Sequence, residues 1–285
     1  MTESWPAPAK LNRFLHVTGR RPDGYHSLQT VFQFLGMHDL LRFDITADGR
    51  IARAQPLAGV PDERDLSVRA ARLLQQAAGG TTQGAIIHLD KHLPLGGGLG
   101  GGSSDAATTL LVLNRMWGLE LDLDRLAELG LQLGADVPVF VRGHAAWGEG
   151  VGELLTPVEL PEDWMVVLVP PVSVSTAEVF AQFDQEDHLT PASPPIRIRG
   201  FHAGQGRNDL EPVVRRLYPE VDKALTWLGK FGDARMTGSG ACLFLPVESE
   251  ARGRAVLAEC PPPLASGFVA RAMNRHPVHQ RLYGN

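Results

Sequence analysis

The sequence predicts a two-domain α+β protein, and three observations support that class. Strand-like runs lie near both ends of the chain and are mixed with amphipathic helices, without a regular βαβ alternation. The length of 285 residues is enough for two modest domains. The composition shifts across residues 156–162, "TPVELPE". We therefore expect a first domain over residues 1–158 and a second over residues 159–285.

Bulk composition excludes several classes of protein. A composition of 44% hydrophobic and 21% charged residues is typical of a soluble globular protein. A net charge of -5 without a dense Lys/Arg cluster argues against a nucleic-acid partner. The N-terminus lacks the features of a signal peptide, and no apolar run approaches membrane-spanning length, so we expect a cytoplasmic protein without a membrane partner. The sequence leaves both a monomer and a homo-oligomer open.

The first half is expected to open on paired strands. Residues 10–19 and 25–36 are strand-like and flank the turn "RRPDG", and residues 39–46 continue the pattern. Residues 65–80 then show helical spacing, with an acid at the start and a glycine pair at the end. A hairpin followed by a helix is therefore predicted.

A glycine loop follows, "LPLGGGLGGGSSDAA", between a short buried strand over residues 84–90 and a helix over residues 103–118. The helix begins with good capping residues. Six glycines in seven positions are costly, because glycine loses the most conformational freedom on folding. A helix N-terminus offers unpaired N–H groups and the positive end of a dipole. A strand, a glycine loop and a helix together predict a phosphate site.

Other interpretations of this loop fit less well. One or two glycines would suffice if the loop were only a tight turn. Gly96, Gly98 and Gly101 match the dinucleotide fingerprint, and Glu120 follows at a suitable distance, but the buried strand that should end in this acid is missing. A Walker A loop would need an internal Lys, for which there is no room. The loop would hold phosphate with backbone groups, or with a Lys from elsewhere.

Later elements are expected in this order. Residues 122–134 form an amphipathic helix, and residues 135–141 a strand, so that Asp136 lies at a helix-to-strand junction, where it could simply brace the turn before Pro138. Residues 183–200 are rich in proline and charge and are expected to be mobile. The second half otherwise contains predicted strands and helices. The strands are residues 164–170, 241–246 and 267–273, and the helices are residues 220–232 and 248–260.

Cysteine and histidine do not predict a metal site. Cys242 and Cys260 cannot make a disulfide framework and are expected to be reduced, with Cys242 packed in an apolar run. His276 and His279 lie in a proline-containing tail without a Cys or acid at ligand spacing. Structural zinc is not expected.

Four stretches carry a resemblance to a known family. "PLGGGLGGGSSDAA" resembles the phosphate-binding motif of the GHMP kinases, P-x-x-x-G-L-G-S-S-A-A. "PAPAKLNRFLHVTGRRPDGYHSLQTVFQFL", "LGADVPVFVRGHAAWGEGVGE" and "RMTGSGACLF" are similar to the other three signatures of one member of that family. These stretches span nearly the whole chain in the right order, so the resemblance extends to one enzyme of the family.

The resemblance implies a two-domain GHMP kinase fold with the active site in the cleft between the domains. It also implies an ATP-dependent kinase that uses Mg²⁺ and phosphorylates the 2-hydroxyl of a cytidine-diphosphate-linked methylerythritol, a step of the non-mevalonate route to isoprenoid precursors. A homoserine or mevalonate type of GHMP kinase is the nearest alternative. A nucleotide-binding regulator without chemistry is a second, although Lys10 and Asp136 are both intact.

Site residues follow from the resemblance, position by position. Asp136 corresponds to the catalytic acid that accepts or orients the acceptor hydroxyl, and Lys10 to a cation that offsets developing negative charge. Asn12, Tyr25, His26 and Phe180 match the acceptor and cytidine pocket. The small-residue turn of Gly238, Ser239 and Gly240 closes the site and does not match a nucleophile elbow.

The nucleotide side of the expected site comprises Lys91, Asp65 and the loop. The loop residues are Pro94, Leu95, Gly96, Gly97, Gly98, Leu99, Gly100, Gly101, Gly102, Ser103 and Ser104. Asp65 stands where the family often has Asn, and Asp can accept from the adenine amino group but cannot donate. Ser104 is the one side chain expected near Mg²⁺, since no carboxylate stands out as a second ligand and phosphates and water would hold the ion.

Overall fold

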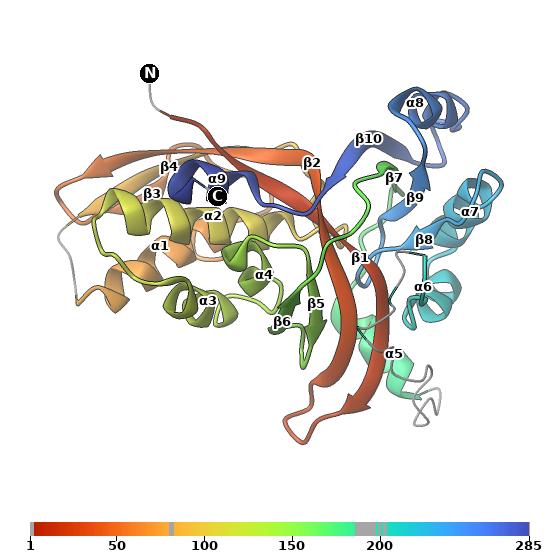
Figure 1. The fold of residues 1–285 in the computed structure, drawn as a ribbon, viewed down its shortest axis with the longest axis horizontal. Helices are drawn as coiled ribbons and strands as arrows, with labels where there is room; N and C mark the ends of the chain where they lie inside the picture. Colours follow the sequence, from red (N-terminus) through yellow and green to blue (C-terminus); the bar gives the residue numbers. More distant parts are fainter. Residues whose placement is uncertain (1–2, 80–82, 186–197, 199–200, 202–203, 285) are drawn as a thin grey trace.

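Two long antiparallel strands organise the molecule. The computed structural model describes residues 3–79, 83–185, 198, 201 and 204–284. β1 (Trp5–Arg20) and β2 (His26–Thr46) pair along most of their length, and Figure 1 shows them running between the two halves. β2 joins the predicted runs of residues 25–36 and 39–46 into one strand, which begins one residue later, at His26. The hairpin that the sequence predicts is therefore confirmed.

A mixed sheet extends from β2 in both directions. Its order among the described residues is β3-β4-β2-β10-β7-β9-β8, with β1 and β5 also paired to β2 and with β6 paired to β5. The remaining strands are β3 (Ile51–Arg53), β4 (Gly84–Asp90), β5 (Ala146–Glu149), β6 (Leu154–Pro157), β7 (Trp164–Val169), β8 (Arg235–Met236), β9 (Leu243–Val247) and β10 (Ser266–Met273). Among the strands in the described residues most pairs are antiparallel, and only β3 and β4 pair in parallel, as expected for an α+β class.

The first half contains helices α1 (Leu66–Ala77), α2 (Gly101–Met116), α3 (Leu123–Leu131) and α4 (Val137–Arg142). All residues of α2 from Ser104 to Asn114 are buried, because this helix packs against α1, α4 and both long strands. The helix is buried even though it carries polar residues such as Asp105 and Thr108. The core of the first half forms around it, and its N-terminus is held in a fixed place.

The second half packs α5 (Thr176–Gln185), α6 (Glu211–Leu217), α7 (Pro219–Leu228) and α8 (Glu250–Ala258) around β7–β10. The chain then returns. β10 pairs with β2 through residues 272–273, and α9 (Pro277–Tyr283) places Val278 in the first-half core. The expected boundary at residues 158/159 stays a prediction, since one sheet joins the two halves (Figure 1).

Two local expectations were wrong. Residues 137–142 form a helix, not a strand, with Pro138 in the first turn and Gly143 in a left-handed conformation at the end. α2 begins at Gly101 after Gly100, so the serines lie inside the helix and do not cap it. The sequence left the conformation of the tail with His276 and His279 open; it is helical, and His276 caps α9 by accepting from the Val278 N–H.

The other expectations can be compared briefly. The mobile segment predicted over residues 183–200 lies largely outside the described residues, except that residues 183–185 complete α5. Both cysteines are free thiols, and Cys242 is fully buried, as predicted. Burial raises the pKa of its thiol to about 12, so Cys242 is a packing residue. No helix in the described part of the chain is long and apolar enough to cross a membrane.

Candidate active site

A cavity of about 1060 Å³ lies between the two halves. Its walls come from β1, β2 and the glycine loop on one side and from α5 and the turn before β9 on the other. Every predicted site residue except Ser104 lines it. These residues are Lys10, Asn12, Tyr25, His26, Asp65, Lys91, residues 94–103, Asp136, Phe180, Gly238, Ser239 and Gly240. Segments far apart in the sequence therefore meet at one place, where the resemblance locates the active site.

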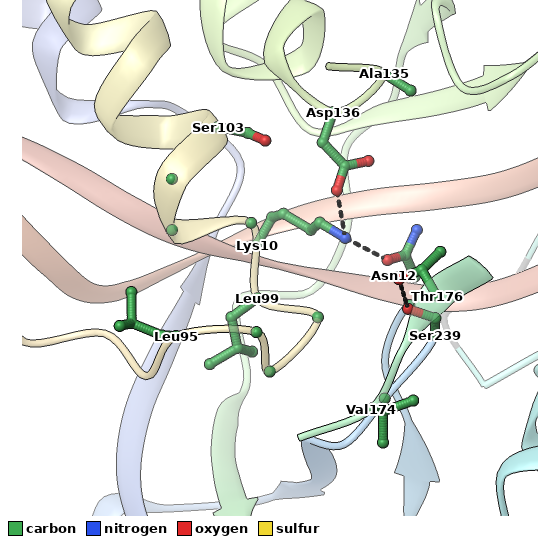
Figure 2. A pocket seen from close by; sticks show the side chains of 18 of the residues that line it. Lys10, Asn12, Leu95, Leu99, Ser103, Ala135, Asp136, Val174, Thr176 and Ser239 are labelled. Atoms are coloured by element: carbon green, nitrogen blue, oxygen red, sulfur yellow. Dashed lines mark hydrogen bonds and ion pairs between the residues drawn. The ribbon is translucent and has the colours of Figure 1, made fainter. Parts of the chain in front are cut away.

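Lys10 and Asp136 form an ion pair at the centre of this cavity. The Lys10 Nζ lies 3.0 Å from Asp136 Oδ2, and it also donates to Asn12 Oδ1 at 2.6 Å (Figure 2). The Lys10 side chain is almost completely buried, whereas the Asp136 side chain is 34% exposed. An ammonium fixed by two acceptors holds the carboxylate in one orientation, and the exposed part of that carboxylate remains accessible to a ligand.

Asp136 occupies the N-cap position of α4 but does not cap the helix. Its carboxylate accepts no bond from the first turn, although Asp is among the preferred capping residues. The side chain is directed to Lys10 instead, as Figure 2 shows. The alternative in which Asp136 only braces the turn is therefore disfavoured by the geometry.

The glycine loop contacts both Lys10 and the turn of residues 238–240. The Lys10 N–H donates to the Leu99 carbonyl at 2.9 Å, and the Cys242 N–H donates to the Gly97 carbonyl at 3.1 Å. Gly98 has φ +77°, and a Cβ on it would lie 2.6 Å from the Thr237 carbonyl oxygen. Glycine is required here because two backbones approach each other closely.

The N-terminus of α2 opens into the cavity without a side-chain cap. Gly100 is in the left-handed conformation (φ 71°) and provides no capping oxygen, so the first-turn N–H groups are available to an anion. Ser103 lines the cavity. Ser104 is completely buried, and its hydroxyl has no hydrogen-bond partner in the structure. The sequence-based expectation that Ser104 contacts Mg²⁺ finds no support in this position.

Lys91 lies below the loop between two buried carboxylates. Its Nζ is 2.5 Å from Asp39 Oδ2 and 2.7 Å from Asp105 Oδ2. Burial opposes the charged ammonium, but Asp105 and Asp39 outweigh that effect and raise the pKa of Lys91. Burial raises the pKa of Asp105 to about 8, against the opposing effect of Lys91. The charge of Lys91 is thus balanced within the protein.

Asp39 also fixes the start of the loop. Its Oδ1 accepts from the backbone N–H groups of His92 and Leu93 at 2.6 and 2.7 Å. The Asp39 side chain is completely buried, and sequence reasoning missed it. A buried acid in a strand was the available signal, but its partners are more than 50 residues away in the sequence.

Asp65 is the N-cap of α1, and both of its carboxylate oxygens have partners within the protein. Its Oδ1 accepts from the backbone of Ser67 and Val68, and its Oδ2 pairs with Arg53 at 3.1 Å. The acid at the start of this helix is therefore confirmed as a cap. Its contact with adenine stays a prediction.

The far end of the cavity is aromatic. The rings of His26 and Phe180 stack with centroids 4.6 Å apart and planes inclined by 19°. His26 Nε2 lies 2.6 Å from Asp184 Oδ1. Tyr25 is 66% exposed nearby. Sequence reasoning missed Asp184, because it lies in the segment expected to be mobile, and yet it fixes the His26 ring.

The turn of residues 238–240 is tied to α5. Ser239 Oγ and Thr176 Oγ1 lie 2.7 Å apart (Figure 2). Gly238 and Gly240 both have positive φ values, which glycine adopts easily. The glycine loop and the turn of residues 238–240 therefore line the same cavity from opposite halves.

Fold and site together define a two-domain small-molecule kinase, and comparison with known proteins agrees. The model described as the GHMP kinases N terminal domain matches residues 65–144, and the model described as GHMP kinases C terminal matches residues 197–262. The chain belongs to the GHMP kinase family, and it has the family's fold.

The relatives within the family share one name. A protein of Marinobacter nauticus is 54% identical, with 97% of this chain and 96% of the relative covered, and one of Thiobacillus denitrificans is 55% identical, with 98% of each covered. Both are called 4-diphosphocytidyl-2-C-methyl-D-erythritol kinase. A crystal structure of 4-(cytidine 5'-diphospho)-2C-methyl-D-erythritol kinase superposes with a TM-score of 0.82 at 32% identity, covering 95% of this chain and 99% of that one.

Proposed function

We propose that this chain is an ATP-dependent kinase that phosphorylates the 2-hydroxyl of 4-diphosphocytidyl-2-C-methyl-D-erythritol, in the non-mevalonate route to isoprenoid precursors. The names of relatives at 54–55% identity over nearly the full length support the acceptor. The geometry supports the chemistry through one observation above all. Asp136 does not cap α4 but pairs with Lys10 at 3.0 Å, in the same cavity as the uncapped N-terminus of α2.

Phosphoryl transfer mainly requires positioning and charge stabilisation. The acceptor oxygen forms a bond to the γ-phosphorus while the bond from that phosphorus to the β–γ bridging oxygen breaks. In the proposed mechanism the Asp136 carboxylate accepts the proton of the acceptor hydroxyl. The Lys10 ammonium, 3.0 Å away, stabilises negative charge that develops on the acceptor oxygen.

The nucleotide phosphates fit the N-terminus of α2. The uncapped N–H groups of its first turn and the positive end of the helix dipole favour an anion, and glycines at residues 96–98 and 100–102 leave the backbone accessible. Phosphate and water oxygens are suitable ligands for Mg²⁺. We propose that the ion arrives with the nucleotide and supplies charge neutralisation there.

The cytidine end of the acceptor fits the aromatic end of the cavity. In this proposal the pyrimidine stacks on the exposed Tyr25 ring and on the free face of Phe180. One face of Phe180 is already covered by His26. The Asp184 carboxylate orients the His26 ring, so that its other nitrogen can contact a base edge.

Turnover of the purified chain tests this function. The chain is incubated with Mg-ATP and 4-diphosphocytidyl-2-C-methyl-D-erythritol, homoserine or mevalonate, and ADP release is followed. We expect ADP only with the cytidyl-linked acceptor, and phosphorus NMR should locate the new phosphate on the 2-hydroxyl. Turnover of another acceptor instead, or ATP binding without ADP formation on any acceptor, would overturn the proposal.

A further inference from the structure

A buried chain of hydrogen bonds lies directly behind the Lys10–Asp136 pair. The Asn12 Nδ2 donates to Thr30 Oγ1 at 2.9 Å, while Asn12 Oδ1 accepts from Lys10 at 2.6 Å. Thr30 on β2 is completely buried and donates its hydroxyl proton to the Phe14 carbonyl. These hydrogen bonds thus connect the backbone of β1 to the candidate catalytic lysine.

The number of protons that these hydrogen-bonding groups can donate fixes the orientation of the Asn12 amide. A threonine hydroxyl has a single proton, and Thr30 gives it to the Phe14 carbonyl. Towards Asn12, Thr30 can therefore only accept, so the amide must present its NH₂ group to Thr30. The amide oxygen then faces the Lys10 ammonium, which has only donors to offer.

The opposite orientation of the amide would disrupt the ion pair. It would place the NH₂ group of Asn12 against the ammonium, donor against donor, and Lys10 would lose the acceptor that it now has at 2.6 Å. The ammonium position that gives 3.0 Å to Asp136 depends on that acceptor. In proteins the two amide orientations differ little in shape, and the hydrogen-bond network selects between them.

We propose that Thr30 is a positioning residue for phosphoryl transfer: it selects the Asn12 amide orientation that holds Lys10 against Asp136. This proposal rests on the proposed kinase function. Thr30 does not act through the backbone of Asn12, because a different residue holds that backbone. The Asn12 N–H donates to Thr237 Oγ1 at 2.9 Å, so loss of the Thr30 hydroxyl leaves the strand in place.

Two substitutions at Thr30 test the proposal. Thr30→Val keeps the shape and removes the hydroxyl, whereas Thr30→Ser keeps the hydroxyl. We expect kcat of Thr30→Val to fall about 10- to 100-fold with KM for ATP nearly unchanged, since a small misplacement of a catalytic group has effects of this size. Thr30→Ser should restore kcat to near the wild-type value. A Thr30→Val kcat within twofold of wild type, or no rescue by Ser, overturns the proposal.

A double-mutant cycle and a control separate positioning from general stability. If Thr30 acts through Asn12, Thr30→Val causes no further loss of kcat in an Asn12→Ala background. If the double variant instead loses kcat by the product of the two single-variant factors, the proposal is contradicted. Thr108 is a matched control, because it is also a completely buried threonine, but its hydroxyl has no hydrogen-bond partner in the structure. Thr108→Val should leave kcat unchanged, and a loss as large as that of Thr30→Val would show a nonspecific effect.

Crystal structures of the two variants give a result that does not depend on turnover. The distance from Lys10 Nζ to Asp136 should exceed 4 Å in Thr30→Val and remain near 3.0 Å in Thr30→Ser. An unchanged distance in Thr30→Val overturns the positioning role even if the wild type is active. A wild type without turnover on the cytidyl-linked acceptor overturns the proposed function instead.

Discussion

At the residue scale, Asp136 stands at a helix N-cap position, but its carboxylate pairs with a lysine and makes no capping bond. An Asp that caps a helix typically stabilises it by about 1 kcal/mol. Asp136 stands at the N-cap of α4 and makes no such bond, while its carboxylate pairs with Lys10. Asp122, by contrast, caps α3 through the Arg125 N–H at 2.7 Å. The two residues differ in what their carboxylates contact, and they form a matched pair for experiment.

Asp136→Asn and Lys10→Ala are expected to abolish turnover without unfolding the chain. Loss of a proton acceptor should lower kcat by about 10²–10⁴-fold, and thermal unfolding of Asp136→Asn should stay close to wild type, because no cap is lost. Steady-state kinetics and calorimetry measure both effects. Asp122→Asn is the control and should leave kcat unchanged. Near-normal turnover of either active-site variant would contradict the assigned roles.

Substitution by asparagine should have different effects at the two acids that pair with Lys91, Asp39 and Asp105. Burial favours the neutral form of the Asp105 carboxyl group and raises its pKa, so Asp105→Asn should be the milder of the two substitutions. Asp39 accepts two backbone N–H groups of the loop stem as well as Lys91. Asp39→Asn should therefore raise KM for ATP at least about tenfold and lower the unfolding temperature. Equal effects of the two substitutions would refute this distinction.

At the scale of elements, the glycine loop requires glycine at one position because its backbone packs directly against the backbone of another turn. Gly98 faces the carbonyls of Thr237 and Gly240, at 2.6 and 3.0 Å from the position of a Cβ. These atoms belong to the turn of the second half, and they cannot move aside as a flexible side chain could. Conformation and space both require glycine at this position.

Gly98→Ala is therefore expected to displace the loop from the turn of residues 238–240. The positive φ alone costs roughly 1–2 kcal/mol for a residue with a Cβ, and the clash adds to it. We expect weaker ATP binding by calorimetry and a lower unfolding temperature. Gly19→Ala is the control, because no atom lies within 4 Å of its Cβ position and its φ is not positive. Equal ATP affinity in Gly98→Ala and wild type would contradict the role of close approach.

Elements with a strong local pattern could be predicted from the sequence, and those decided by packing could not. The hairpin, the helices starting at Leu66 and Leu123, and the strands of the second half follow from periodicity and turn residues. Residues 137–141 contain three valines and a phenylalanine, which favour a strand. Burial against α2 and α3 makes this segment helical, although Pro138 and Gly143 were valid helix signals.

The candidate site divides in a similar way. The residues that the resemblance identified lie within contiguous motifs, and all of them except Ser104 line the cavity. Thr30 and Asp39, which the resemblance did not identify, contact partners 18 and more than 50 residues away in the sequence. A buried Thr or Asp in a strand has no local pattern that reveals such a partner. Only the folded chain brings these pairs together.

At the scale of the whole molecule, α9 connects the end of the second half to the first. His276 is completely buried and caps α9, with its ring against those of Phe34 and Phe140. Burial, and to a smaller extent neighbouring His279, lower the pKa of His276 well below its ordinary value. His276 is therefore neutral in the folded chain, and its charged form is incompatible with this position.

Stability is expected to decrease on acidification because of His276. A depressed histidine pKa contributes stability that is complete above the unfolded pKa of about 6.5 and is lost as the pH falls below it. The slope is at most about 1.4 kcal/mol per pH unit for one proton. His276→Asn retains a capping group but cannot titrate, so its unfolding free energy should fall less between pH 7 and pH 5. An unchanged slope in His276→Asn would refute the prediction.

The return of β10 and α9 has a consequence for synthesis on the ribosome. Domains usually fold from the N-terminus as they emerge. Here the first-half core lacks Val278, and the middle of β2 lacks β10, until residues 266–283 have been made. Arg281 then reaches the Ser4 carbonyl at 2.7 Å. A nascent chain halted near residue 158 would carry an uncovered core and an open strand edge, so the two halves must mature together.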